Sequence, residues 1–131
     1  MTMESFFKNK KLLTITFWLW AAMIIYFTFT PNSPRLKIDL KEQSIRLDYL
    51  FHFIVYFGLT VLYFLWKSDK NFKIKTKFLL YFIITAILFS GISELLQHYI
   101  PGRSFNPIDF YSNTAGIIVG AIAPKLILKN Q

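Results

Sequence analysis

The chain has 131 residues, of which 54% are hydrophobic and 19% are aromatic, and it carries a net charge of +8 at pH 7. Its apolar residues form four long blocks that contain almost no charged side chains, and these blocks leave no room for a separate soluble domain. The absence of cysteine excludes disulfide bonds and thiolate chemistry.

Each apolar block is close to the ~20 residues that a helix needs to cross ~30 Å of hydrocarbon. The sequence therefore predicts an all-α fold, a four-transmembrane-helix membrane bundle that forms one domain over residues 1–131. The predicted helices span about residues 11–30, 47–66, 77–99 and 107–123.

The first block is too long for the apolar region of a signal peptide and no cleavage site follows it, so we expect a retained helix. Pro31 and Pro34 follow it. Because this helix is apolar on all sides, we expect it to pack loosely and to face lipid. In the loop over residues 31–47, the spacing of Leu36, Ile38 and Leu40 indicates a short interfacial segment on the membrane.

The third and fourth predicted helices have clear boundary signals. Pro101 disfavours helical geometry in the residue before it, so the third helix is expected to end near Tyr99. Only a short loop follows, and these two helices should form an antiparallel hairpin. Asn106 can cap the fourth helix, Pro107 suits its first position, and Pro124 is expected to end it.

The distribution of positive charge predicts how the helices are oriented. Ten of the 15 Lys and Arg residues lie on the side of the two termini: Lys8, Lys10, Lys11, Lys67, Lys70, Lys73, Lys75, Lys77, Lys125 and Lys129. The other five lie on the opposite side: Arg35, Lys37, Lys41, Arg46 and Arg103. The positive-inside rule then predicts that both termini are cytoplasmic, and it accounts for the charge without a nucleic-acid partner.

Polar residues form one stripe on each of the last three helices, because residues three or four apart share a helix face. The stripe on the second helix is Asp48, His52 and Tyr56, and that on the third includes Glu94, Gln97 and His98. The stripe on the fourth helix is Asp109, Asn113, Gly116 and Gly120. Lipid would penalise these stripes, so they are expected to face one another. The acids, amides and histidines, with Arg103, all lie near the predicted external boundary. This depth predicts a polar pocket open to the extracytoplasmic side and argues against a channel.

Several of these residues also have simpler interpretations. Gly116 and Gly120 are four residues apart, a spacing typical of close helix packing. Asp109 can complement the dipole of its own helix. Arg103 can bind a lipid phosphate or pair with Asp109 or Glu94. His98 can simply reach the interface.

The same residues resemble a known family. Asp48-x3-His52-x3-Tyr56, then Glu94-x2-Gln97 with Pro101-Gly102-Arg103, then Asp109-x3-Asn113-x2-Gly116-x3-Gly120 are similar in order and spacing to the VanZ-like family. His98 is not part of that pattern. The resemblance implies a multi-pass protein of the bacterial cytoplasmic membrane, linked to the cell envelope or to tolerance of glycopeptide antibiotics such as teicoplanin. It implies no defined reaction.

Three function classes remain open. In the first, the pocket binds a lipid head group or an amphiphile in the outer leaflet through Arg103, Asn113, Gln97 and Tyr56, while the acids and His52 set the charge. In the second, an intramembrane enzyme acts on a lipid-linked envelope precursor, with His52, Glu94 and Asp109 as catalytic candidates. A metal-dependent variant would use the same three residues as ligands.

We expect membrane lipids as partners, no resident metal or cofactor, and no nucleic acid. The sequence also leaves open a homo-oligomer that forms through the Gly116 and Gly120 face. A small transporter built from such an oligomer is the third function class.

Overall fold

The structure is a computed structural model that describes residues 9–31, 37–40 and 43–128. Within these residues, four helices are long and apolar enough to cross a membrane. They are α2 (Lys10–Phe29), α3 (Asp48–Lys67), α4 (Thr76–Gln97) and α5 (Pro107–Leu128). The predicted all-α, four-helix architecture is confirmed.

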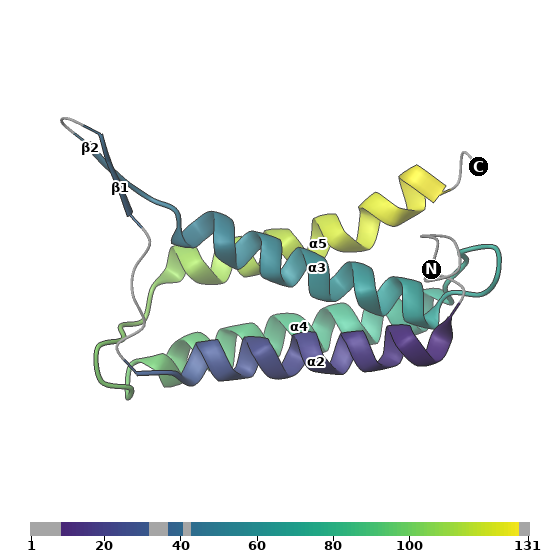
Figure 1. Cartoon of the computed structure of the whole chain (residues 1–131), viewed down its shortest axis with the longest axis horizontal. Coiled ribbons are helices and arrows are strands. Elements are labelled where there is room, and N and C mark those ends of the chain that lie inside the picture. Colours follow the sequence, from purple (N-terminus) through teal and green to yellow (C-terminus); the bar gives the residue numbers. More distant parts are fainter. Residues whose placement is uncertain (1–8, 32–36, 41–42, 129–131) are drawn as a thin grey trace.

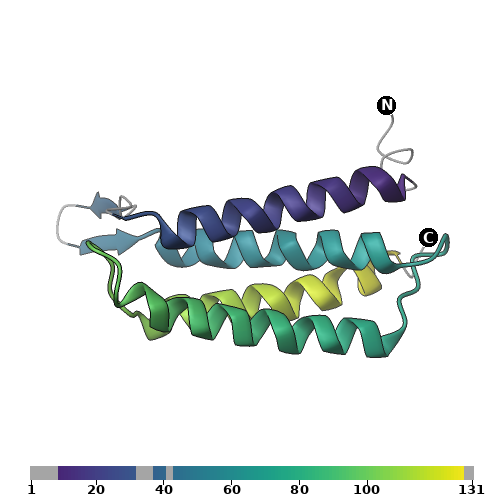
Figure 2. The ribbon, with the colours of Figure 1, turned by 90° about the horizontal axis from the view of Figure 1, so that it is seen from below.

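The helices form one bundle in which successive helices alternate in direction, so that α3 and α5 run parallel to each other. Figures 1 and 2 show α3 beside α5, with α2 packed on α3 and α4 packed on α5. Helix α2 begins and α5 ends at the same end of the bundle. At the opposite end, α3 and α5 begin and α4 ends, so the polar residues near these three helix termini are brought to one level (Figure 1).

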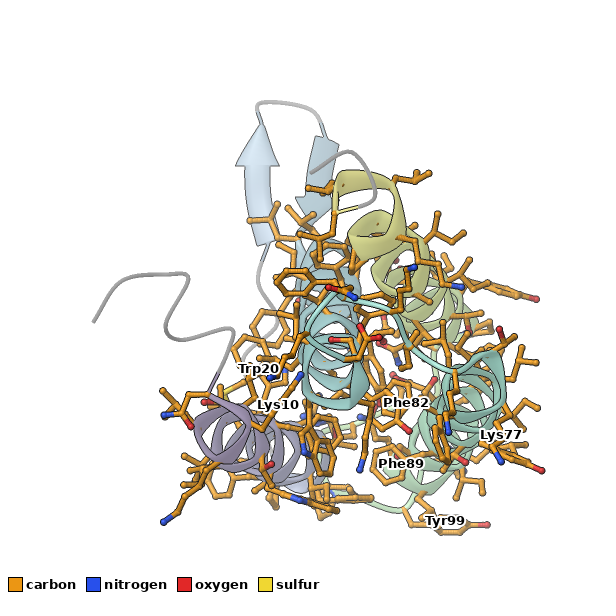
Figure 3. The ribbon with its side chains drawn as sticks, turned by 90° about the vertical axis from the view of Figure 1, so that its right-hand side faces the viewer. Lys10, Trp20, Lys77, Phe82, Phe89 and Tyr99 are labelled. Carbon is orange, nitrogen blue, oxygen red and sulfur yellow. The ribbon has the colours of Figure 1, made fainter. Side chains whose placement is uncertain are left out.

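Large apolar side chains fill the centre of the bundle and also cover its outer surface. Phe17, Leu59 and Ile117 are buried at its centre, and Figure 3 shows Phe82 and Phe89 on the inner side of α4. Large apolar side chains such as Trp18, 60% exposed, cover the outside. In water such a surface would be unfavourable, whereas in lipid it is the expected exterior.

Helix α2 is the least buried of the four spans, in keeping with the prediction that it faces lipid, but polar contacts also attach it to α3. Lys10 Nζ donates to the carbonyl oxygens of Leu65 (2.6 Å) and Ser68 (2.7 Å), where α3 ends. The indole Nε1 of Trp20 donates to the carbonyl of Val55 at 2.9 Å. Figure 3 shows Lys10 and Trp20 on the side of α2 that faces α3. The sequence did not indicate these contacts, because an apolar surface pattern does not reveal polar contacts made by tryptophan and lysine tips.

Two helix ends differ from those predicted. α4 ends at Gln97, and the next turns use bonds three residues apart, from His98 N to Leu95 O (3.3 Å) and from Tyr99 N to Leu96 O (3.0 Å). α5 continues through Pro124 to Leu128. A proline inside a helix removes one backbone hydrogen bond but leaves the later ones intact, and membrane helices tolerate this.

The predicted interfacial segment over residues 31–47 contains a β-hairpin. Strand β1 (Lys37–Leu40) pairs antiparallel with β2 (Gln43–Arg46), and Ile38 lies opposite Ile45. The spacing of apolar residues at every second position is also the period of a strand. Part of this segment, with Leu36, and four of the charges used to predict orientation lie outside the described residues: Lys8, Arg35, Lys41 and Lys129.

Candidate functional site

The polar cluster lies where α3 and α5 begin and α4 ends, and the start of α5 positions part of it. Asn106 caps this helix as predicted, because its Oδ1 accepts the backbone N–H of Ile108 at 3.1 Å. The cap fixes the first turn, so that Asp109 and, one turn later, Asn113 point into the bundle. Both side chains are buried, Asp109 being 7% exposed and Asn113 1%.

One hydrogen-bonded chain joins the three helices. The Nδ1 of His52 on α3 lies 3.0 Å from Oδ1 of Asn113 on α5. The amide nitrogen of Asn113 donates to Oε1 of Glu94 on α4 at 3.4 Å. An amide oxygen only accepts, so Nδ1 of His52 carries the proton and the Nε2 lone pair is left for another partner.

Two carboxylates complete the cluster. The Nε2 of His52 lies 3.8 Å from Oδ2 of Asp109, and Asp109 interacts electrostatically with Glu94, which is only 1% exposed. Glu94 Oε2 and Asp109 Oδ1 are buried and find no hydrogen-bond partner within the described part of the chain. Buried carboxylate oxygens are costly without a donor or a cation, so the cluster is electrostatically incomplete.

Gly116 and Gly120 bring α3 and α5 close enough for this contact. A Cβ at Gly116 would clash with the carbonyl oxygen of Phe53, and one at Gly120 would lie 2.8 Å from that of Phe57. The two glycines therefore lie against α3 of the same chain. This face is therefore covered within a single chain, and a homo-oligomer stays a prediction.

Gln97 and Arg103 reach the C-terminal end of α2, and Arg103 also interacts electrostatically with Glu94 of the cluster. Gln97 Nε2 donates to the carbonyl of Thr28 at 3.3 Å, and Arg103 Nε donates to that of Thr30 at 3.3 Å. Arg103 also donates through a terminal nitrogen to the carbonyl of Phe27. The last turn of α2 contains no basic residue of its own, so these donors satisfy carbonyls that a helix end leaves unpaired.

This part of α2 is the element that sequence reasoning missed. The polar stripes predicted from the sequence involve only the other three helices, so the contacts at the end of α2 were not predicted. Its contribution is made by backbone carbonyls, which carry no residue-specific signal. The absence of a basic residue from the last turn of α2 is the sequence feature that could have indicated donors from elsewhere in the chain.

The remaining predicted residues occupy the edges of the cluster. Tyr56 is buried one turn below His52 and interacts electrostatically with Glu94. Asp48 is the first residue of α3 and is half-buried. His98 is exposed and packs edge-on against Tyr99, with ring centroids 5.5 Å apart, so the structure places it outside the cluster.

A family model described as VanZ/LLP1 matches residues 15–128. The chain belongs to this family. The match covers most of the chain and includes every residue of the polar cluster, so the predicted resemblance is confirmed. No significant match was found among curated proteins or among solved structures. The chain is thus a VanZ/LLP1 membrane protein with four apolar helices, and the family assignment does not itself name a ligand or a reaction.

Proposed function

We propose that this VanZ/LLP1 protein binds the polar head group of a lipid or other amphiphile at the cluster of His52, Glu94, Asp109 and Asn113. The observation that carries the proposal is the pair of buried carboxylate oxygens, on Glu94 and Asp109, without a donor among the described residues. A ligand that supplies donors or positive charge would complete the cluster.

The surroundings support a ligand that enters from lipid. The His52 side chain is 22% exposed. Leu50, Phe51 and Ile108 near it are large, apolar and about half exposed, so hydrocarbon chains can lie against them. Carboxylates accept hydrogen bonds and repel anions, which favours head groups with hydroxyl, amide or ammonium groups.

Arg103 has a different part in this proposal from the one the sequence indicated. Its donations to the carbonyls of Phe27 and Thr30 support a role in holding α2, and its electrostatic interaction with Glu94 adds positive charge beside the cluster. Contact between Arg103 and a ligand phosphate stays a prediction.

The positive-inside rule supports cytoplasmic termini and therefore a cluster at the extracytoplasmic end. The family resemblance supports a location in the bacterial cytoplasmic membrane. A ligand would then enter from the outer leaflet. Envelope lipids and teicoplanin, to which the family resemblance points, are the first amphiphiles to test.

The test is ligand retention by protein purified in nanodiscs that contain envelope lipids, with and without teicoplanin. We expect Glu94→Gln and Asp109→Asn to lose a ligand that wild type retains in native mass spectra. Asp69→Asn is the matched control, because this substitution removes one negative charge at the opposite end of the bundle. Asp69 Oδ1 accepts backbone hydrogen bonds in a turn there, and the amide oxygen of asparagine can accept the same bonds. Equal retention by wild type and both cluster variants would refute the proposal.

A second function is favoured by one observation. The Nε2 of His52 lies 3.8 Å from Oδ2 of Asp109, and Oε2 of Glu94 has no hydrogen-bond partner among the described residues. This arrangement is suited to general acid–base chemistry on a lipid-linked envelope precursor. Turnover of such a substrate by purified protein would establish it if His52→Ala and Glu94→Gln abolish turnover and His98→Ala does not. Equal turnover by His52→Ala and His98→Ala would rule it out.

A further inference from the structure

His52, Glu94 and Asp109 come from three different helices, yet they converge on one point. Each offers one ligand atom, an imidazole nitrogen or a carboxylate oxygen, and these atoms all lie within 4.8 Å of one another. The two acids are buried and His52 is half-buried. Two of the available oxygens, Glu94 Oε2 and Asp109 Oδ1, have no hydrogen-bond partner among the described residues.

We propose that His52, Glu94 and Asp109 form a binding site for a divalent transition-metal ion, with Zn²⁺ as the best match. One imidazole and two carboxylates are ligands that Zn²⁺ accepts, and a site with three protein ligands keeps a fourth position for water or another molecule. The imidazole favours a transition metal over Mg²⁺ or Ca²⁺, which prefer oxygen ligands alone.

The distances suit a shared ion. Two ligands bonded to one metal at about 2.1 Å lie about 3.4 Å apart in tetrahedral geometry. His52 Nε2 and Asp109 Oδ2 are 3.8 Å apart, close to that spacing without forming a short hydrogen bond. All of the ligand atoms lie within 4.8 Å of one another, so small side-chain rotations of Glu94 or Asp109 would bring them to that spacing.

Asn113 supplies the supporting contacts that metal ligands usually need. It accepts from Nδ1 of His52, which directs the Nε2 lone pair into the cluster. It also donates to Oε1 of Glu94, which leaves Oε2 available. A partner that fixes both the tautomer of a histidine and the orientation of a carboxylate is typical of the residues around a metal site.

Charge also favours a cation. Glu94 and Asp109 repel one another in a buried environment, and Arg103, which interacts electrostatically with Glu94, and a protonated His52 offset this repulsion only from the edges of the pair. A divalent ion would neutralise both carboxylates at once. The ion would occupy the same oxygens as those in the proposed function, and a head group would then bind at the fourth position that the ion leaves open. Metal binding is nevertheless measured without any lipid ligand, so the two proposals can fail separately. It replaces our expectation of no resident metal.

The test uses the full chain in detergent micelles, stripped with a chelator, reloaded with Zn²⁺ and dialysed, with metal content measured by mass spectrometry. We expect wild type to retain one Zn²⁺ per chain. We expect His52→Ala and Glu94→Gln to lose it and Asp109→Asn to bind at least tenfold more weakly. His98→Ala is the matched control, because His98 is the chain's other histidine and is exposed.

Cobalt gives an independent readout. Co²⁺ bound to one nitrogen and two or three oxygens absorbs visible light, and the band should appear in wild type and His98→Ala but not in His52→Ala. Asn113→Ala should keep the band and bind about 10–100-fold more weakly. Circular dichroism and gel filtration establish that each variant is folded. Absence of stoichiometric Zn²⁺ and Co²⁺ binding by folded wild type would overturn the proposal, as would equal loss in His98→Ala and His52→Ala.

Discussion

Replacing Gly116 with alanine tests whether close packing of α3 on α5 positions the polar cluster. The new Cβ would lie 3.0 Å from the backbone nitrogen of Phe57 and closer still to the carbonyl oxygen of Phe53. Both are backbone atoms of α3, so the clash cannot be relieved by a side-chain rotation. The two helices must move apart.

The required movement can be worked out from these contacts. Ordinary van der Waals contact begins at 3.4 Å, so the contact to Phe57 alone requires a shift of about 0.4 Å, and the one to Phe53 requires more. His52 Nδ1 and Asn113 Oδ1, now 3.0 Å apart, lie one turn away and would separate toward the limit of a hydrogen bond. Overpacking of this kind lowers the free energy of unfolding by about 1–3 kcal/mol.

The assay has two parts. Unfolding in mixed micelles, followed by tryptophan fluorescence, gives the loss of stability. The ¹⁵N shifts of the imidazole ring, recorded in the His98→Ala background so that His52 alone is seen, report the tautomer that Asn113 fixes. Gly116→Ala should lose stability and show a mixture of tautomers.

Gly91→Ala is the matched control. Its Cβ would lie 3.3 Å from the ring of Phe110, a side chain that can turn aside, so we expect a change within about 0.5 kcal/mol. If Gly116→Ala were as stable as Gly91→Ala and kept one tautomer, the proposed link between helix packing and the cluster would be wrong.

The remaining predictions concern α2 and the orientation of the chain. Arg103→Ala should lower the free energy of unfolding by about 1.5–3 kcal/mol, because the carbonyls at the end of α2 lose a charged donor; an unchanged unfolding midpoint would contradict that role. Trp20→Phe should cost about 0.5–1.5 kcal/mol through its lost indole hydrogen bond, whereas the exposed Trp18→Phe should cost less in the same titration. The chain has no cysteine, so an introduced cysteine is its single thiol. Tyr99→Cys should react with a membrane-impermeant thiol reagent in intact cells, and Lys70→Cys only after lysis. The reverse pattern would show that the predicted orientation is wrong.

The sequence by itself determined the four spanning helices and most of the polar cluster. A long apolar block in lipid satisfies its own backbone hydrogen bonds as a helix, so hydropathy alone was sufficient to predict the four membrane-spanning segments. The positions of His52, Glu94, Asp109 and Asn113 followed from helical periodicity, because lipid excludes polar stripes and only the bundle interior can accept them. These are local properties of each segment.

Helix ends and connections were determined less well, because tertiary contacts compete with local signals there. Pro124 lies inside α5 rather than after it. Apolar residues at every second position were interpreted as an interfacial segment, but the same period is that of the paired strands β1 and β2.

Only the tertiary structure decided which groups meet. It directed Arg103 and Gln97 to the carbonyls at the end of α2, and it set His52, Glu94 and Asp109 within reach of one ion, with Asn113 orienting two of them. Such pairings depend on how far each helix is rotated and which helix is its neighbour. Packing between distant segments sets both, and no local pattern in any one helix records them.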